Sequence, residues 1–344
     1  MCEQCGFVSK TRQAAPVLME YGKRIEGLWS GYCTGIGVQD ADGTLRMGKT
    51  LGYSKCWEEK FSIDNFPGTA GLFHSRTGWT GGPGDERYAH PFLSSDGASL
   101  GVSQGAKGIF TAECDEAIVR IGNMLLDSGR KLGSADPTVT ERYTMLKDGT
   151  RVHMSDVVNE YAAYLLAQGY KPMDAVRKVG TDILEESTTM FIFRDYPGHI
   201  FVINMNQRLC VWSHEDGKSI ATCALAFGDK QVPVTEIPGN CVADITADYI
   251  HFETLSPELQ LLQEVKPGLH KDFLDWVRKT PETLLAHVMD NALKLHYPAD
   301  VLRHVPTHEV FEQLYYDGNF VLTTKEYPGV RETDQSIRTA ISMK

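Results

Sequence analysis

The chain has 344 residues, of which 42% are hydrophobic, so it can bury a substantial core as one large or two ordinary domains. Its formal net charge of -11 at pH 7 repels phosphate backbones and anionic lipid surfaces, which argues against nucleic acid or a membrane as a partner. The opening Met-Cys-Glu-Gln-Cys does not resemble a secretory signal, and no run approaches the ~20 apolar residues that span a bilayer. We therefore expect a globular cytoplasmic protein.

Short apolar runs and glycine-rich turns alternate over the first hundred residues, which predicts strands with one amphipathic helix near 15–28. These strands are expected at 5–9, 32–38, 45–52 and 70–76. Helices are predicted at 113–128, at 171–184 and after Ser155, which would cap its helix. Strand-like runs follow at 189–195, 199–206, 209–213, 232–237 and 241–249. Helices between two sets of strands predict an α+β fold.

Beyond Ile250 the pattern becomes helical, with segments at 256–265, 270–279, 281–296 and 307–318 separated by Pro and Gly. We therefore place a domain boundary there. Eight cysteines are scattered along a chain without a signal, and they are typical of reduced thiols. Cys2 and Cys5 form a CxxC, but no second Cys or His pair completes a zinc site. No metal and no cofactor are expected.

Cys2 becomes the first residue if Met1 is removed. A free α-amine titrates near ~7.7 to 8, so it can take the thiol proton of its own residue. One residue would then supply both the nucleophile and the base. The alternative is that Cys2 is an ordinary residue of a frayed chain end.

The sequence MCEQCGFV resembles the start of class II glutamine amidotransferases, and Glu3 resembles a stand-alone bacterial subgroup that begins MCE. The segment GLWSGYCTGIGV resembles a turn of the same family, with Ser30 where the family has Arg. The matching residues in these two segments are Cys2, Gly6, Gly31, Tyr32 and Gly35.

The segment FHSRTGWTGGPGDERYAHPF carries the most specific resemblance, to the family's His-Thr-Arg-Trp-Ala-Thr-His-Gly stretch and the Asn-Ala-His-Pro that follows it. It matches at His74, Arg76, Thr80, Gly82, Ala89, His90 and Pro91. The resemblance implies a substrate site that includes Arg76, Thr80, Gly81 and His90. Arg76 can hold the glutamine α-carboxylate through a bidentate fork, although a surface salt bridge is its alternative role. His90 is expected to hold the loop and not to act as a base.

The segment LGVSQGAKGIF lies where the family carries an Asn-Gly pair that forms the oxyanion hole. Gly105 matches, while Gln104 offers the same amide on a stem that is one methylene longer. Such a donor contributes ~2.7 to 4 kcal/mol in enzymes that use one. Asp156 resembles the family's Asp that binds the substrate ammonium, and its alternative role is an acid at a helix start. Asp136 is a second candidate for the ammonium.

The resemblance covers about residues 2–250 and implies a four-layer αββα N-terminal nucleophile hydrolase sandwich, with a mainly helical C-terminal extension over 251–344. It implies hydrolysis of the glutamine side-chain amide to glutamate and ammonia, with Cys2, Gln104 and Gly105 as the catalytic residues. The extension is short for a domain and has no phosphate-binding loop, so the ammonia acceptor is expected on another chain or is absent. The chain is then expected to be a glutaminase subunit or a stand-alone amidotransferase without its own acceptor domain. A separate synthase subunit and a second copy of the chain are both candidate partners.

Two alternatives remain open. Another N-terminal-Cys hydrolase, acting on a different amide, would share the nucleophile but would not need Arg76 and Asp156 to clamp an amino acid. A binding or regulatory protein that keeps the fold without catalysis would fit the departures at Ser30 and Gln104.

Overall fold

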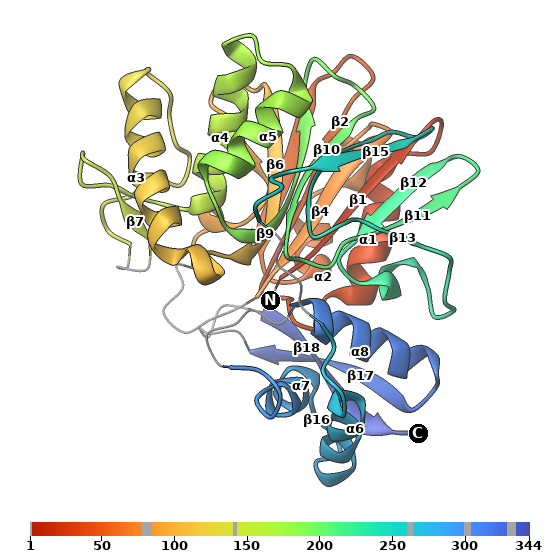
Figure 1. Cartoon of the computed structure of the whole chain (residues 1–344). Coiled ribbons are helices and arrows are strands. Elements are labelled where there is room, and N and C mark those ends of the chain that lie inside the picture. Colours follow the sequence, from red (N-terminus) through yellow and green to blue (C-terminus); the bar gives the residue numbers. More distant parts are fainter. Residues whose placement is uncertain (1, 78–83, 140–142, 260–263, 299–303, 329–334) are drawn as a thin grey trace.

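The computed structural model describes residues 2–77, 84–139, 143–259, 264–298, 304–328 and 335–344. Two antiparallel sheets lie face to face, and helices cover their outer faces (Figure 1). A smaller body, built from the end of the chain, packs below the strand ends at which the N-terminus lies (Figure 1). The predicted α+β fold is confirmed.

The first sheet has its N-terminal strand in the middle, paired on both sides. Its strands, in spatial order, are β13 (Thr235–Glu236), β11 (Cys210–His214), β12 (Gly217–Ala221), β1 (Glu3–Ser9), β4 (Ala70–Arg76), β2 (Cys33–Gln39) and β3 (Leu45–Leu51). The strands predicted near the chain start all belong to this sheet. Its inner strands are buried over their whole length.

The second sheet takes its strands mainly from the middle of the chain. In spatial order they are β15 (Ile250–Thr254), β14 (Asn240–Ile245), β10 (Ile200–Met205), β9 (Glu186–Phe193), β6 (Ser99–Ala106) and β5 (Phe92–Leu93). A two-stranded sheet of β7 (Thr144–Met145) and β8 (Arg151–Val152) lies outside it. Because β15 pairs with β14, the second sheet continues to Thr254, past the predicted boundary at Ile250.

Helices cover each sheet with one apolar face. Helix α1 (Ala14–Ile25) packs on the first sheet through Leu18 and Ile25, and α2 (Ser54–Lys60) adds Trp57. Helices α4 (Met154–Ala167) and α5 (Pro172–Asp182) cover the second sheet, and α3 (Thr111–Asp127) packs against α4. Helix α4 begins one residue before the predicted cap, since the His153 side chain, and not that of Ser155, accepts the capping hydrogen bond.

The core between the sheets follows from the alternation of side chains along a strand. On β4, Leu72 points toward the second sheet, where it joins Leu100 and Val102 of β6, while Phe73 points to α1. The same alternation carries His74 and Arg76 to the face between the sheets at the end of β4. The apolar layer between the two sheets is therefore bounded by polar side chains at this end of β4.

The C-terminal segment contains helices α6 (Leu269–Lys279), α7 (Leu285–Leu293) and α8 (His304–Tyr316). It also contains a sheet of β16 (Thr283–Leu284), β18 (Gln335–Met343) and β17 (Phe320–Pro328), which the prediction of a mainly helical extension missed. Strand β17 is exposed over much of its length, so its sequence lacks a clear apolar alternation. Residues 256–259, inside a predicted helix, form a turn.

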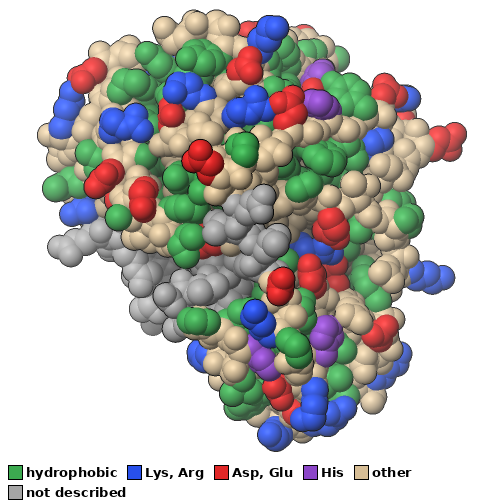
Figure 2. Space-filling model, in the orientation of Figure 1, with side chains coloured by type: hydrophobic (Ala, Val, Ile, Leu, Met, Phe, Trp, Pro, Cys, Tyr) green, Lys and Arg blue, Asp and Glu red, His purple; other side chains and the backbone are tan. Residues whose placement is uncertain are grey.

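Basic and acidic side chains are interspersed on the face that Figure 2 presents. None of the helices in the described ranges combines the length and the apolar character that a membrane crossing needs.

Truncation of Leu72 tests the layer between the sheets. Leu72 is fully buried there, so Leu72→Ala removes packing and leaves a cavity, and the free energy of unfolding should fall by about 2–5 kcal/mol. The same substitution at Leu295, which is 63% exposed, should change it by less than about 0.5 kcal/mol. Urea unfolding of both variants measures the difference. Equal losses would show that the layer is not the main core.

Candidate active site

Cys2 lies at the end of the central strand, beside the end of β4. The β1–β4 register pairs Glu3 with Ser75, so Cys2, one residue earlier, falls next to Arg76. The Cys2 thiol is close enough to the Arg76 guanidinium for the two groups to interact electrostatically. Cys2 is half-buried and forms no disulfide. The structure therefore brings the predicted nucleophile and the predicted substrate arginine together.

Arg76 is held in place without using all of its donors. It is 8% exposed, and it donates from Nη1 to the Tyr88 carbonyl (2.6 Å) and from Nη2 to the Tyr143 hydroxyl (2.9 Å). A guanidinium has five N–H donors, and the described residues supply hydrogen-bond partners for two of them. The remaining donors can bind a carboxylate.

Gln104 and Gly105 end β6 in the opposite sheet. Gln104 is buried on the same side of β6 as Val102, and its Oε1 has no hydrogen-bond partner within the described ranges. Gly105 has φ +136°, and a Cβ there would lie 2.3 Å from the Glu186 carbonyl oxygen, so the position requires glycine. The His74 ring nitrogen Nε2 and the Ser103 carbonyl lie 3.0 Å apart, which joins the ends of β4 and β6.

His90 sits in a cluster of histidine rings, tilted against His74 and edge-on to His153. Its ring centroid lies 4.0 Å from that of His74 and 5.3 Å from that of His153. Burial, and then the neighbouring His74, hold the pKa of His90 far below its ordinary value. A histidine with a pKa far below neutral is a weak general base near neutral pH, because it holds an accepted proton poorly. This agrees with the expected role of His90 in holding the loop.

Asp156 lies in the first turn of α4 and is almost fully buried. Its Oδ2 accepts hydrogen bonds from the backbone N–H (2.8 Å) and the hydroxyl (2.7 Å) of Ser134. Burial raises the pKa of Asp156 to about 6, against the opposing effect of these two bonds. The other oxygen, Oδ1, lies outside this pair of bonds. Asp136, the second candidate, instead pairs with Arg87 at 2.6 Å and accepts from Thr138.

Thr80 and Gly81 lie outside the described residues, so the structure does not place them.

Two groups near the candidate site, Lys49 and Tyr143, were not predicted from the sequence. Lys49 donates to the carbonyls of Ala89 (2.8 Å) and Pro91 (3.2 Å), and burial lowers its pKa to about 8. Tyr143 binds Arg76 from a segment without a motif. Nothing in the local sequence pattern distinguishes either one.

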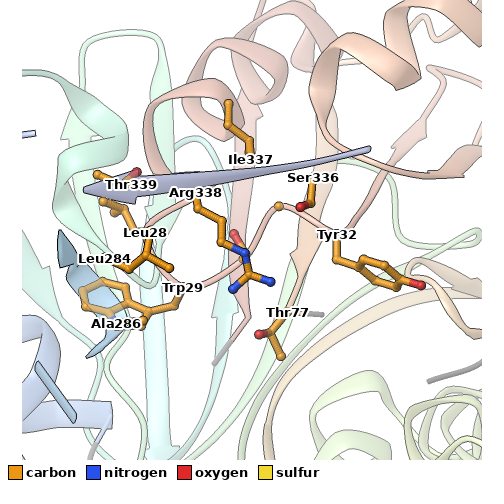
Figure 3. A pocket seen from close by; sticks show the side chains of 13 residues that line it. Leu28, Trp29, Tyr32, Thr77, Leu284, Ala286, Ser336, Ile337, Arg338 and Thr339 are labelled. Atoms are coloured by element: carbon orange, nitrogen blue, oxygen red, sulfur yellow. The ribbon is translucent and has the colours of Figure 1, made fainter. Parts of the chain in front are cut away.

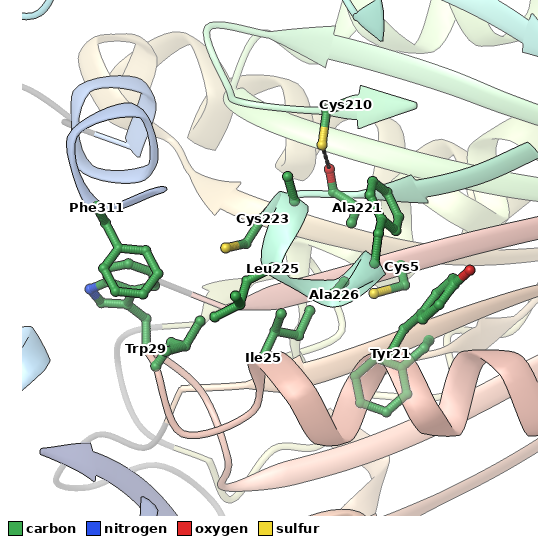
Figure 4. Close-up of a cluster of buried hydrophobic side chains, with 14 of the residues drawn as sticks. Cys5, Tyr21, Ile25, Trp29, Cys210, Ala221, Cys223, Leu225, Ala226 and Phe311 are labelled. Carbon is green, nitrogen blue, oxygen red and sulfur yellow. Dashed lines mark hydrogen bonds between the residues drawn. The ribbon is translucent and has the colours of Figure 1, made fainter. Parts of the chain in front are cut away.

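Glu3, the residue after the candidate nucleophile, connects β1 to the C-terminal segment. Its carboxylate is fully buried, accepts from the Thr222 hydroxyl at 2.5 Å and lies 3.3 Å from the His308 ring nitrogen of α8. Trp29 packs edge-on against His308 and Phe311, with centroids 5.0 and 5.2 Å apart, and Figure 4 shows the Trp29–Phe311 contact. Burial, opposed by the Thr222 hydrogen bond, raises the pKa of Glu3 to about 8.

Comparison with known proteins gives a partial match. No protein-family model matches the sequence. The chain is 29% identical over 157 residues to the glutamine–fructose-6-phosphate aminotransferase [isomerizing] of Methanothermobacter thermautotrophicus, a match over 41% of this chain and 26% of that protein. The matched region therefore spans about a quarter of the length of this curated relative.

Two solved structures share the fold at low sequence identity. The glutamine phosphoribosylpyrophosphate amidotransferase from B. subtilis superposes with a TM-score of 0.57 at 10% identity, over 94% of this chain and 66% of that one. A structure described as the allosteric regulatory enzyme of purine biosynthesis gives 0.57 at 11%, over 87% and 64%. The resemblance to class II glutamine amidotransferases is confirmed, in part of the sequence and in the fold.

Substitution of Gly105 tests the close backbone contact near the end of β6. Gly105→Ala adds a methyl group that meets a backbone oxygen at a positive φ, so the chain must shift locally. Gly149→Ala is the control, because Gly149 has φ +84° with nothing within 4 Å of its added Cβ. Urea unfolding should show a loss of about 1 kcal/mol for Gly149→Ala and a clearly larger one for Gly105→Ala. Equal losses would contradict the close contact.

A pH titration of stability tests the buried Glu3. Its folded-state pKa of about 8 exceeds the unfolded value of about 4.3, so the folded state keeps a proton that the unfolded state loses. This contribution to stability is complete below pH ~4.3 and is lost as the pH rises through 8. The free energy of unfolding of the wild type should thus fall relative to Glu3→Gln across this window.

The control for this titration is Glu59→Gln, which removes an exposed carboxyl and should show no such change relative to the wild type. Parallel curves for the wild type and Glu3→Gln, measured by urea unfolding at each pH, would contradict the raised pKa.

Proposed function

We propose that this chain is a class II glutamine amidotransferase with an N-terminal nucleophile fold, in which Cys2 hydrolyses the side-chain amide of glutamine after Met1 is removed. The observation that carries the proposal is the position of Cys2 next to Arg76 on neighbouring strands. The end of β6 that bears Gln104 and Gly105 is joined to β4 through His74 and Ser103. The partial sequence match and the shared fold support the same reaction class.

The proposed reaction begins when the free α-amine of Cys2 takes the thiol proton. The thiolate attacks the amide carbon, and the negative charge that develops on the carbonyl oxygen is met by the Gln104 side-chain amide and the Gly105 backbone N–H. The C–N bond breaks, the ammonium of Cys2 returns its proton to the leaving nitrogen, and ammonia departs. Water then cleaves the thioester and releases glutamate.

Recognition of the amino acid end of glutamine is assigned to Arg76 and Asp156. The guanidinium donors of Arg76 that have no partner among the described residues fit the α-carboxylate, and a carboxylate on Asp156 fits the α-ammonium. Because the pKa of Asp156 is about 6, the group is mainly ionised at neutral pH, when it can pair with that cation. Ser134 fixes the orientation of the carboxylate through Oδ2.

The proposal places the acceptor of ammonia on another chain, which leaves a synthase subunit and a second copy as the candidate partners. Residues 2–254 would form the glutaminase domain, since β15 completes its second sheet. The segment from Leu269 onward would be an extension that packs next to the nucleophile.

An ammonia-release assay with glutamine tests the function. The wild type should form equal amounts of glutamate and ammonia, and Cys2→Ser should lower kcat by at least about a hundredfold because a serine hydroxyl is a weaker nucleophile. Arg76→Lys should raise KM for glutamine by about tenfold or more, since a lysine cannot reproduce the bidentate fork. Intact mass of the active protein should show the loss of Met1.

Three outcomes count against the proposal. Full activity with Met1 retained would remove the proposed base. Unchanged KM in Arg76→Lys, with a thermal unfolding curve like that of the wild type, would favour a hydrolase of another amide. A folded wild type that binds glutamine without releasing ammonia would favour a binding protein. The Gln104 Oε1, which has no hydrogen-bond partner among the described residues, also fits that role.

A further inference from the structure

A cavity of about 100 Å³ lies between the turn at 27–32 and the C-terminal sheet (Figure 3). Trp29, Ser30 and Thr77 line one side, and Leu284 and Arg338 line the other. A water molecule occupies about 30 Å³ of liquid, so the space suits a group of a few heavy atoms. The cavity is therefore large enough for a carboxylate or a phosphate.

Backbone hydrogen bonds fix the two walls. The Ile337 N–H donates to the Gly31 carbonyl at 3.2 Å, and the Thr339 N–H donates to the Gly27 carbonyl at 2.9 Å. Gly31 has φ +106°, and a Cβ there would lie 2.6 Å from the Ile337 carbonyl oxygen. Strand β18 and the turn are thus in close register, and the cavity is a built feature of their junction.

One buried polar atom in the wall, the Ser30 Oγ, has no hydrogen-bond partner among the described residues. Ser30 is 8% exposed, and no residue in the described ranges forms a hydrogen bond with its Oγ. A buried hydroxyl without a hydrogen bond costs about 1–3 kcal/mol. A ligand oxygen in the cavity would accept that hydrogen bond.

Arg338 supplies positive charge at the same place. Its side chain extends from β18 toward Thr77 and Trp29 in Figure 3, and it forms no hydrogen bond or ion pair with the part of the chain that the structure describes. The β17–β18 register places Lys325 directly opposite, and Lys325 likewise has no acidic partner in the described ranges. Like charges at facing positions are destabilising, and an anion between them relieves the repulsion.

The neighbouring carboxylate does not neutralise this pair. Glu326 belongs to the next register pair, with Ile337, so its side chain points to the other face of the hairpin. There it accepts from the Tyr53 hydroxyl at 2.5 Å and lies 3.6 Å from the Lys55 ammonium. Within the described residues, Arg338 and Lys325 are thus two cations on one face without an acidic partner, in a chain whose net charge is -11.

We propose that this cavity binds the carboxylate or phosphate group of a small soluble molecule, with Arg338 as the forked donor, Ser30 as a hydroxyl donor and Lys325 as a second positive charge. Thr77 follows Arg76 directly, so the ligand would lie beside the proposed glutamine site. The binding itself does not depend on the chemistry of Cys2.

Titration calorimetry with inorganic phosphate and with malonate tests the site on the full chain. The wild type should bind at least one of the two at concentrations up to about 20 mM, and Arg338→Ala should weaken that binding by about tenfold or more. Ser30→Ala and Lys325→Ala should each weaken it by a smaller factor. Lys279→Ala is the matched control, because it removes an exposed cation from α6 of the same segment and should leave the affinity within about twofold.

Absence of binding of both anions to the wild type would overturn the proposal. Equal anion affinities in the wild type and Arg338→Ala would also overturn it. A loss of affinity in Lys279→Ala as large as that in Arg338→Ala would overturn it too, because it would show a non-specific effect of charge. Thermal unfolding of each variant confirms that the fold is kept. Cys2→Ser should bind the anion as the wild type does, because the anion site does not use the thiol. A wild type that binds the anion but releases no ammonia from glutamine would therefore contradict the proposed function and leave the anion site supported.

Discussion

The placement of the first strand in the middle of a sheet is the constraint on which the candidate site depends. Chain ends fray unless they are tied down, and β1 is hydrogen-bonded on both sides, to β4 and to β12. The register of β1 with β4 then fixes which residue Cys2 meets. A slip of one residue would turn Cys2 to the face covered by α1 and carry it away from the second sheet.

The second sheet completes the site because strands from both sheets end at the same level. His74 of β4 and the Ser103 carbonyl of β6 are joined at 3.0 Å, so Arg76, two residues after His74, and Gln104, next to Ser103, lie at the same end of the two sheets. Apolar residues fill the layer farther from this end, and buried polar groups replace them near it. Buried groups of this kind favour a ligand that supplies their missing partners.

The C-terminal segment is connected to the site through two contacts of different kinds. His308 of α8 reaches the buried Glu3, one residue from Cys2. Strand β18 forms backbone hydrogen bonds with the turn at 27–32. In that turn the Gly31 N–H donates to the hydroxyl oxygen of Ser75 in β4, at 3.0 Å. The segment thus closes one side of the two-sheet body instead of standing apart from it.

The sequence by itself determined most strands of the first sheet, the helix at 15–28 and the α+β class, because apolar alternation and helical spacing are local properties. It missed β12, which pairs directly with β1. It also singled out Cys2, Arg76 and Gly105 through motifs, although the motifs say nothing about distance. The hairpin of β17 and β18 escaped detection, since an exposed strand has little apolar alternation.

Only the tertiary structure decided which groups meet. Lys49, Tyr143 and His308 have no motif around them, and they enter the site because the sheet register and the packing of α8 carry them there. The pairing of Asp156 with Ser134 depends in the same way on a contact between distant segments. Such contacts are set by the summed packing of the whole chain, which no short stretch of residues specifies.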